Sequence, residues 1–148
     1  MSNRINGADN VLVDSGKRGL KKGMITLWKL TKIVVPVYFF VTFLKMSHAL
    51  DTISIWFEPA MQIIGLPGEA SVVLVLGNFI NLYASIGAIA SMTLTIKQIT
   101  ILSVMLSFSH SLFLESAVAK RTGVSIALVV FIRLTLAVVS GIILNIVL

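Results

Sequence analysis

Long apolar runs separated by short polar stretches dominate the sequence after residue 32. A helix that spans a membrane needs about 20 mostly apolar residues, and four runs approach or exceed that length. A weaker stretch, 51–64, contains Asp51, Glu58 and Pro59 and is too short and too polar to span, so we interpret it as an interfacial or re-entrant piece. The four runs are 33–50, 71–92, 99–119 and 124–148.

The residues before the first run follow a different pattern. Residues 1–16 mix polar and small side chains without periodicity, which predicts a flexible polar tail. From residue 17 the basic residues recur at helical spacing within an arc of about 140°, and Trp28 lies near its edge. This predicts a basic amphipathic helix over 17–32 that lies in the membrane interface; the alternative is a soluble extension of the first span. The basic residues are Lys17, Arg18, Lys21, Lys22, Lys29 and Lys32.

Polar residues interrupt the runs at specific places. Pro36 and Lys45 lie in the first run. We expect Lys45 to reach the far membrane surface, and the alternative is a functional role in an ion pair or a polar cavity. Gly65-Leu66-Pro67-Gly68-Glu69 is a strong helix breaker, with Glu69 at the start of the next helix. If the second run is one continuous helix, Asn78, Asn81 and Ser85 share a face of it.

The third run contains the densest polar cluster, and a continuous helix there conflicts with its residues. His110 and Glu115 would each cost about 2.5–3.5 kcal/mol in the middle of a spanning helix. If all four runs cross the membrane from a cytoplasmic N-terminus, Lys120 and Arg121 fall outside, against the positive-inside rule. Both conflicts ease if 107–116 is a broken or re-entrant element that faces protein or water. We therefore predict an interruption there.

Composition supports a membrane protein. Of the 148 residues, 57% are hydrophobic and 12% charged, whereas soluble domains carry about 25% charged residues. The chain has no cysteine, which leaves no thiolate ligand or nucleophile. Seven of its twelve basic residues precede the first run, which predicts a cytoplasmic N-terminus and binding of anionic headgroups, in preference to nucleic acid. We predict an all-α integral membrane protein with four to five membrane segments, in which 17–148 form one domain.

The candidate site follows from the polar interruptions. Interrupted helices in transporters expose side chains and helix ends that bind solute near the bilayer midplane. The alternative is that these groups only bond neighbouring helices; for Asn78 and Asn81 both interpretations stay open, and for His110 with Glu115 we favour a functional role. Arg133 is expected to pair with Glu115 or to face a polar cavity. His110, Glu115 and His48 do not have the spacing of a metal site, and no arrangement indicates an enzyme or a cofactor.

Several motifs follow one another along the chain: Gly-Leu-Lys-Lys-Gly (19–23), Ile-Val-Val-Pro-Val-Tyr (33–38), Gly-Leu-Pro-Gly-Glu-Ala (65–70), Asn-Phe-Ile-Asn-Leu-Tyr-Ala-Ser-Ile-Gly (78–87) and Ser-His-Ser-Leu-Phe-Leu-Glu-Ser-Ala-Val (109–118). Together they resemble the bacterial nucleoside recognition, or Gate, domain family over about residues 19 to 148. The resemblance includes its small stand-alone members, the spore maturation A and B type proteins, and the Gate regions of concentrative nucleoside transporters and of ferrous-iron transporter B. It implies a transporter-like half-unit that works with a second, related chain.

The sequence thus predicts half of a dimeric, permease-like complex for a small polar solute in a bacterial inner membrane. By resemblance the solute is nucleoside-like, and Asn78, Asn81, His110 and Glu115 contact it. The partner is an inverted paralogue or a parallel identical copy, because the strong basic bias opposes an inverted identical copy. The alternative is a non-transporting assembly or regulatory subunit that binds a partner membrane protein.

Overall fold

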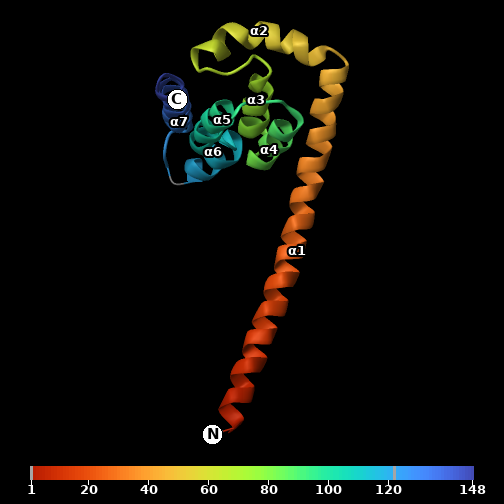
Figure 1. Cartoon of the computed structure of the whole chain (residues 1–148). Coiled ribbons are helices and arrows are strands. Elements are labelled where there is room, and N and C mark those ends of the chain that lie inside the picture. Colours follow the sequence, from red (N-terminus) through yellow and green to blue (C-terminus); the bar gives the residue numbers. More distant parts are fainter. Residues whose placement is uncertain (1, 122) are drawn as a thin grey trace. The chain divides into compact units, whose positions relative to one another are not determined.

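The computed structural model describes residues 2–121 and 123–148, with side chains from residue 14 onward. In these ranges the chain forms helices and no strand, which confirms the predicted all-α fold (Figure 1). The chain divides into two compact units, Met1–Ile33 and Val34–Leu148, which are described separately. The helices are α1 (Ser2–Met46), α2 (Ala49–Ile63), α3 (Ala70–Phe79), α4 (Leu82–Ser91), α5 (Ile96–Ser109), α6 (Leu112–Arg121) and α7 (Ile126–Val147).

The first unit is the amino-terminal part of α1. Its basic residues from Lys17 to Lys29 are exposed, and the Nζ atom of Lys32 lies 5.4 Å from the centroid of the Trp28 ring. This distance is typical of a cation–π contact. The amphipathic helix expected over 17–32 is therefore part of α1, while its location in the membrane interface and the mobility of residues 1–16 stay predictions.

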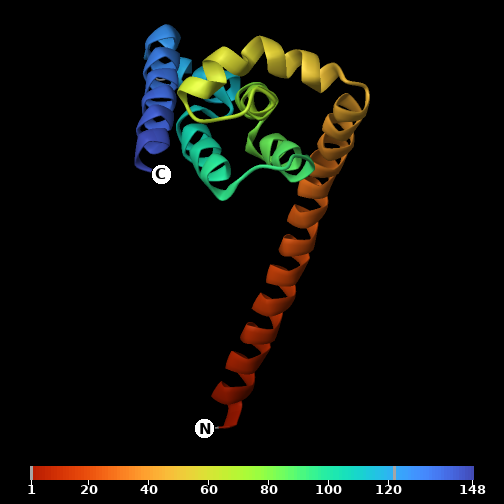
Figure 2. The ribbon, with the colours of Figure 1, turned by 45° about the horizontal axis from the view of Figure 1, so that its top comes forward.

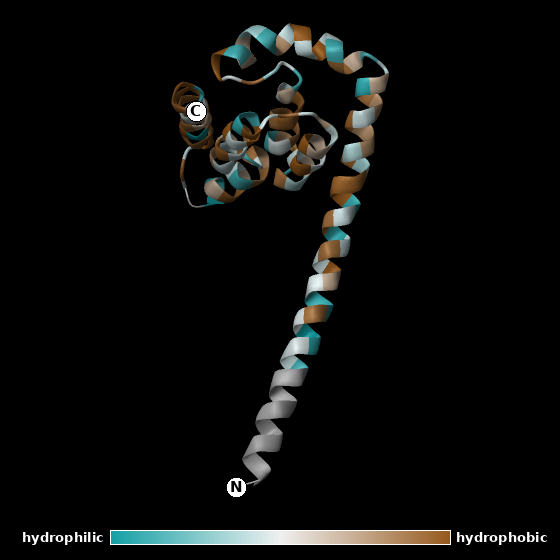
Figure 3. Cartoon of the chain, in the orientation of Figure 1, coloured by the Kyte–Doolittle hydropathy of each residue, from teal (hydrophilic) through white to brown (hydrophobic). Residues whose placement is uncertain are grey.

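In the part of the chain that the structure describes, three stretches are long and apolar enough to cross a membrane. They are Asp14–Met46, Ile96–Arg121 and Ile126–Val147. Figure 3 shows hydrophobic residues along most of α7, in agreement with the span predicted over 124–148. Helix α2 has 15 residues and is about 22 Å long, which is shorter than the hydrocarbon core of a bilayer.

The second apolar run forms a hairpin of two short helices, so the continuous helix considered for 71–92 is wrong. Helix α3 ends at Phe79 and α4 begins at Leu82, and the two pack against each other. The buried Ser85 hydroxyl donates to the Val73 carbonyl at 3.1 Å. Gly77 permits this close approach, because a Cβ atom there would overlap the Ser85 hydroxyl. Asn78 consequently lies on α3 and Ser85 on α4.

Asn81 explains why the second apolar run does not continue as one helix. Its backbone is extended and its side-chain oxygen accepts the Ala84 N–H at 3.0 Å, so Asn81 is the N-cap of α4. An asparagine in this position satisfies one of the free N–H groups at a helix start. A residue whose side chain favours a new helix start thus divides an apolar run that is long enough to span.

The predicted interruption of the third run is confirmed. Helix α5 ends at Ser109, His110 is extended and Ser111 has a φ of 52°, after which α6 begins at Leu112. A left-handed conformation is unfavourable for a residue with a side chain. Both short helices pack on α7, and α5 makes the most extensive contact (Figure 2).

The breaker at 65–69 is also confirmed, and side chains from two helices hold it. The Glu58 carboxylate accepts the Gly68 N–H at 2.6 Å, where a Cβ atom would collide with the Ser54 carbonyl. Asn145 near the end of α7 donates to the Ile63 carbonyl at 3.3 Å, and Lys97 donates to the Asn145 carbonyl at 2.9 Å. The start of α3, the start of α5 and the end of α7 therefore lie on the same side of the unit.

Candidate functional site

The tip of the α3–α4 hairpin meets the interruption between α5 and α6. The Ser111 N–H donates to the Gly77 carbonyl at 2.9 Å, which ties the left-handed residue to the last turn of α3. Gly77 also approaches Leu106 so closely that a Cβ atom would overlap its side chain. The aromatic rings of Phe79 and Phe113 lie 5.0 Å apart beside this crossing. Two interrupted segments thus meet through their backbones.

Arg133 on α7 binds the broken end of α5. Its Nε donates to the Phe108 carbonyl at 2.6 Å and its Nη2 donates to the His110 carbonyl at 3.0 Å. The last carbonyls of a helix lack partners within the helix and carry the negative end of its dipole. A guanidinium group from a neighbouring helix supplies both the donors and the positive charge that this end requires.

Glu115 in the first turn of α6 forms an ion pair with Arg133. The first turn of a helix favours a negative charge, because its N–H groups form the positive end of the dipole. The side chains of Arg133 and Glu115 are 15% and 44% exposed, so the pair lies at the border between the packed interior and an open face. The interruption is therefore flanked by charges that match the two helix ends.

His110 completes this cluster. Its Nδ1 lies 2.8 Å from the Leu106 carbonyl, and because a carbonyl only accepts, Nδ1 is the donor in this contact. Its Nε2 lies 3.4 Å from Glu115 Oε1 on the other side. The imidazole is thus held between the backbone of α5 and the carboxylate of α6, with its ring 31% exposed.

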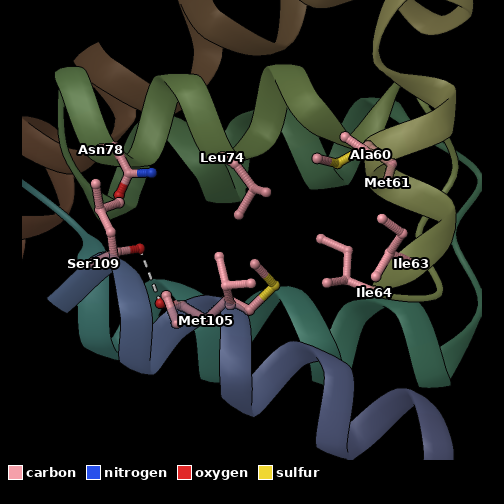
Figure 4. A pocket seen from close by; sticks show the side chains of 11 residues that line it. Ala60, Met61, Ile63, Ile64, Leu74, Asn78, Met105 and Ser109 are labelled. Carbon is pink, nitrogen blue, oxygen red and sulfur yellow. Dashed lines mark hydrogen bonds between the residues drawn. The ribbon is translucent and has the colours of Figure 1, made fainter. Parts of the chain in front are cut away.

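A cavity of about 330 Å³ lies among α2, α3, α5 and α7, close to the interruption (Figure 4). Asn78 and Ser109 form its polar end, while Leu74, Met105 and Ile64 belong to its apolar wall. The Ser109 hydroxyl donates to the Met105 carbonyl at 3.0 Å. The Asn78 side-chain oxygen is buried and has no hydrogen-bond partner among the residues that the structure describes. An unpaired buried oxygen costs about 1–3 kcal/mol, so this amide is available to a bound donor.

The structure brings His110, Glu115 and Arg133 together and places Asn78 one residue from the Gly77 carbonyl that binds Ser111. It separates the other candidates. Asn81 serves as a helix cap, and Lys45 is exposed in the last turn of α1.

His48 is not part of the cluster of His110, Glu115 and Arg133. Its Nδ1 atom lies 2.9 Å from Asp51 Oδ2, and Asp51 is its ion-pair partner. Within the described residues no three His, Asp or Glu side chains gather closely enough to hold a metal ion.

Sequence reasoning missed the roles of Gly77 and Ser111. The serine lies in the interruption predicted over 107–116, but its left-handed backbone has no sequence signal, because such a φ is uncommon outside glycine and asparagine. Gly77 precedes the polar Asn78 in an apolar run, and a glycine in that setting can mark close helix packing.

The sequence of the chain is similar to a known protein family and to a known membrane protein. The family model for Gate, described as nucleoside recognition, matches residues 27–146. The chain is 43% identical over 129 residues to a Bacillus subtilis (strain 168) protein described as uncharacterized membrane protein YvoD; the match covers 87% of this chain and 41% of that protein. The chain thus spans less than half the length of this relative. No solved structure matches the chain. Because the family model covers most of its length, the chain belongs to the Gate, or nucleoside recognition, family of membrane proteins.

Proposed function

We propose that this chain supplies one half of a permease-like membrane complex, and that a small polar solute binds where its two interrupted segments meet. The observation that carries the proposal is the bond between the Ser111 N–H and the Gly77 carbonyl, beside a charged cluster in a chain with apolar helices. In secondary transporters, broken helices of this kind form solute sites near the middle of the bilayer. Family membership favours a solute of the nucleoside class.

Helix lengths support a site deep in the membrane. Helix α3 has 10 residues, about 15 Å, which is half of a hydrocarbon core of about 30 Å. If α3 starts at one membrane surface, its tip lies near the midplane. Helix α5 starts on the same side of the unit, and its 14 residues bring its broken end to a similar depth.

The hairpin also supports a topology that accounts for the basic residues. Because α3 and α4 return to the side on which they start, α5 and α6 cross from that side to the other. Lys120 and Arg121 then lie on the side of the predicted cytoplasmic N-terminus, as the positive-inside rule requires. Lys120 and Arg121 fall outside, against the positive-inside rule, only if residues 71–92 are treated as a full crossing.

The residues available to a solute differ in what they already bind. Glu115 and His110 are partly exposed at the interruption, and Asn78 has an unpaired oxygen in the neighbouring cavity. We assign these three to solute contact. The Asn81 oxygen is used by its own helix, so Asn81 shapes the hairpin tip.

A half-unit needs a second set of interrupted segments, from another chain or from another part of a longer one. More than half of the length of the Bacillus subtilis relative lies outside the matched region, which leaves room for a further unit in that protein. This supports a two-unit complex. For a separate partner chain, the strong basic bias favours an inverted paralogue or a parallel identical copy.

One observation favours a second function, a subunit that assembles with a partner protein without transport. Arg133 donates to the Phe108 and His110 carbonyls and forms an ion pair with Glu115. Its hydrogen-bonding groups thus have partners without a solute, as expected for a purely structural contact. The two functions differ in whether water reaches the interruption.

Cysteine labelling distinguishes them, because the chain has no native cysteine. Under the transport proposal, Ser107→Cys and His110→Cys in membrane vesicles react with a water-soluble maleimide. The control is Phe131→Cys on α7; Phe131 is apolar and 68% exposed, so a cysteine there stays protected by lipid. Protection of all three positions supports the assembly subunit instead. Uptake of labelled uridine and adenosine by cells with and without the chain then tests the solute class, with Glu115→Gln expected to abolish any gain.

A further inference from the structure

A second cavity, of about 510 Å³, lies along α6 and is distinct from the one beside Asn78. On α6 its lining residues recur at helical spacing from the first turn to the last, so the cavity is a groove that follows one face of the helix. Phe79 of α3 borders it at one end, and the first two turns of α7 form the other wall. The groove is lined by Phe79, Leu112, Phe113, Ser116, Ala117, Lys120, Ile126 and Val130.

The length of the groove matches one leaflet of a bilayer. Helix α6 has 10 residues and is about 15 Å long, while the hydrocarbon core of a membrane is about 30 Å thick. The inner end of the groove lies beside the interruption, where Phe79 and Phe113 meet. Its outer end is Lys120, in the last turn of α6.

Charge is confined to the outer end. Lys120 lines that end, and Arg121 follows it in the last turn of α6. Both side chains are exposed, and neither takes part in an ion pair within the described residues. No acidic residue lines the groove, and Glu115, the acidic residue of α6, is paired with Arg133 and faces His110. Apart from the buried Ser116, the remainder of the lining is apolar.

We propose that this groove binds one anionic phospholipid, with an acyl chain along α6 and the phosphate at Lys120 and Arg121. An apolar channel one leaflet long suits an acyl chain. Lys120 at its surface end and the adjacent Arg121 suit a negative headgroup. A free phosphate ion would use the cations and leave the apolar groove empty, so the lipid accounts for more of the lining. This site is separate from the solute site and from the basic residues of 17–32.

Native mass spectrometry of the purified full chain tests the site, with phosphatidylglycerol and phosphatidylcholine added in equal amounts to the detergent. The wild type should retain one phosphatidylglycerol in preference to phosphatidylcholine. Each surface cation contributes about fivefold to anionic lipid binding, so Lys120→Ala together with Arg121→Ala should lower the preference about 25-fold. Ala117→Trp fills the middle of the groove and should remove the bound lipid while both cations remain.

Lys45→Ala is the matched control, because it removes an exposed cation from the last turn of another helix and should leave the preference unchanged. Equal retention of the two lipids by the wild type overturns the proposal. So does undiminished retention of phosphatidylglycerol by Ala117→Trp, because the lipid would then be held at the headgroup without the groove. An equal effect of Lys45→Ala would indicate diffuse attraction to the net positive charge and would also refute the site.

Discussion

Replacement of Arg133 by methionine is the sharpest test of how the interrupted helix is held. Methionine has a similar length and no donor, so Arg133→Met removes the two hydrogen bonds to the Phe108 and His110 carbonyls and the ion pair with Glu115. The Phe108 and His110 carbonyls at the end of α5 then lose the positively charged donor that caps them, at a site where Arg133 is only 15% exposed. We expect α5 and α6 to lose their fixed relation before the rest of the unit unfolds.

The magnitude follows from the three contacts. Hydrogen bonds to a charged group contribute about 1.5–3 kcal/mol in soluble proteins, but side-chain bonds between membrane helices average about 0.6 kcal/mol. A value of about 1 kcal/mol for each carbonyl bond lies between these limits. The ion pair adds at most about 1 kcal/mol because Glu115 is 44% exposed. The expected loss is therefore about 3 kcal/mol in the free energy of unfolding.

Unfolding of the full chain by sodium dodecyl sulfate in mixed micelles, followed by circular dichroism, measures this loss. Arg133→Lys should lose about 2 kcal/mol, since one ammonium group cannot reach three oxygen atoms on two helices. Glu115→Gln should lose about 1 kcal/mol, and the double variant with Arg133→Met should lose less than the sum of the two. The control Thr135→Met alters an exposed residue two positions along α7. If Arg133→Met is no less stable than this control, Arg133 does not hold the helix end.

Three further predictions concern topology and the two interruptions. A reporter inserted at Gly123 should be active on the cytoplasmic side, because the α3–α4 hairpin returns to its own side; activity outside would contradict that topology. Ser111→Gly should keep or raise the free energy of unfolding, and Ser111→Val should lower it by about 1–2 kcal/mol, because a β-branched residue is strained at a φ of 52°. Equal free energies of unfolding for the two variants in the same assay would show that the left-handed turn is not maintained. Asn81→Ala should cost about 1 kcal/mol and Asn81→Ser much less, because serine also caps a helix; no loss with alanine would exclude a stabilising cap.

The amino-acid sequence by itself determined the class of the protein and most helix positions. Low charge and long apolar runs require a lipid environment, which does not depend on how the helices pack. The breaker at 65–69 and the interruption within 107–116 were also predictable, because glycine, proline and clustered ionisable residues are unfavourable inside a lipid-facing helix. For Arg133 the sequence left two alternatives, a pair with Glu115 or a polar cavity, because a charge is not stable alone in that setting. The structure shows the ion pair.

The tertiary structure decided where the chain reverses and what each polar residue binds. The run 71–92 is long enough to span, and the structure divides it at Ile80 and Asn81 because an N-cap and the close packing of Gly77 against Ser85 stabilise a hairpin. The contact between Ser111 and Gly77 joins residues 34 positions apart through backbone atoms, which carry no side-chain signal in the sequence. Asn78 and Asn81 have the same side chain and lie three residues apart, yet one faces a cavity and the other caps a helix. Their roles differ because a helix ends between them, and packing against α5 fixes that end.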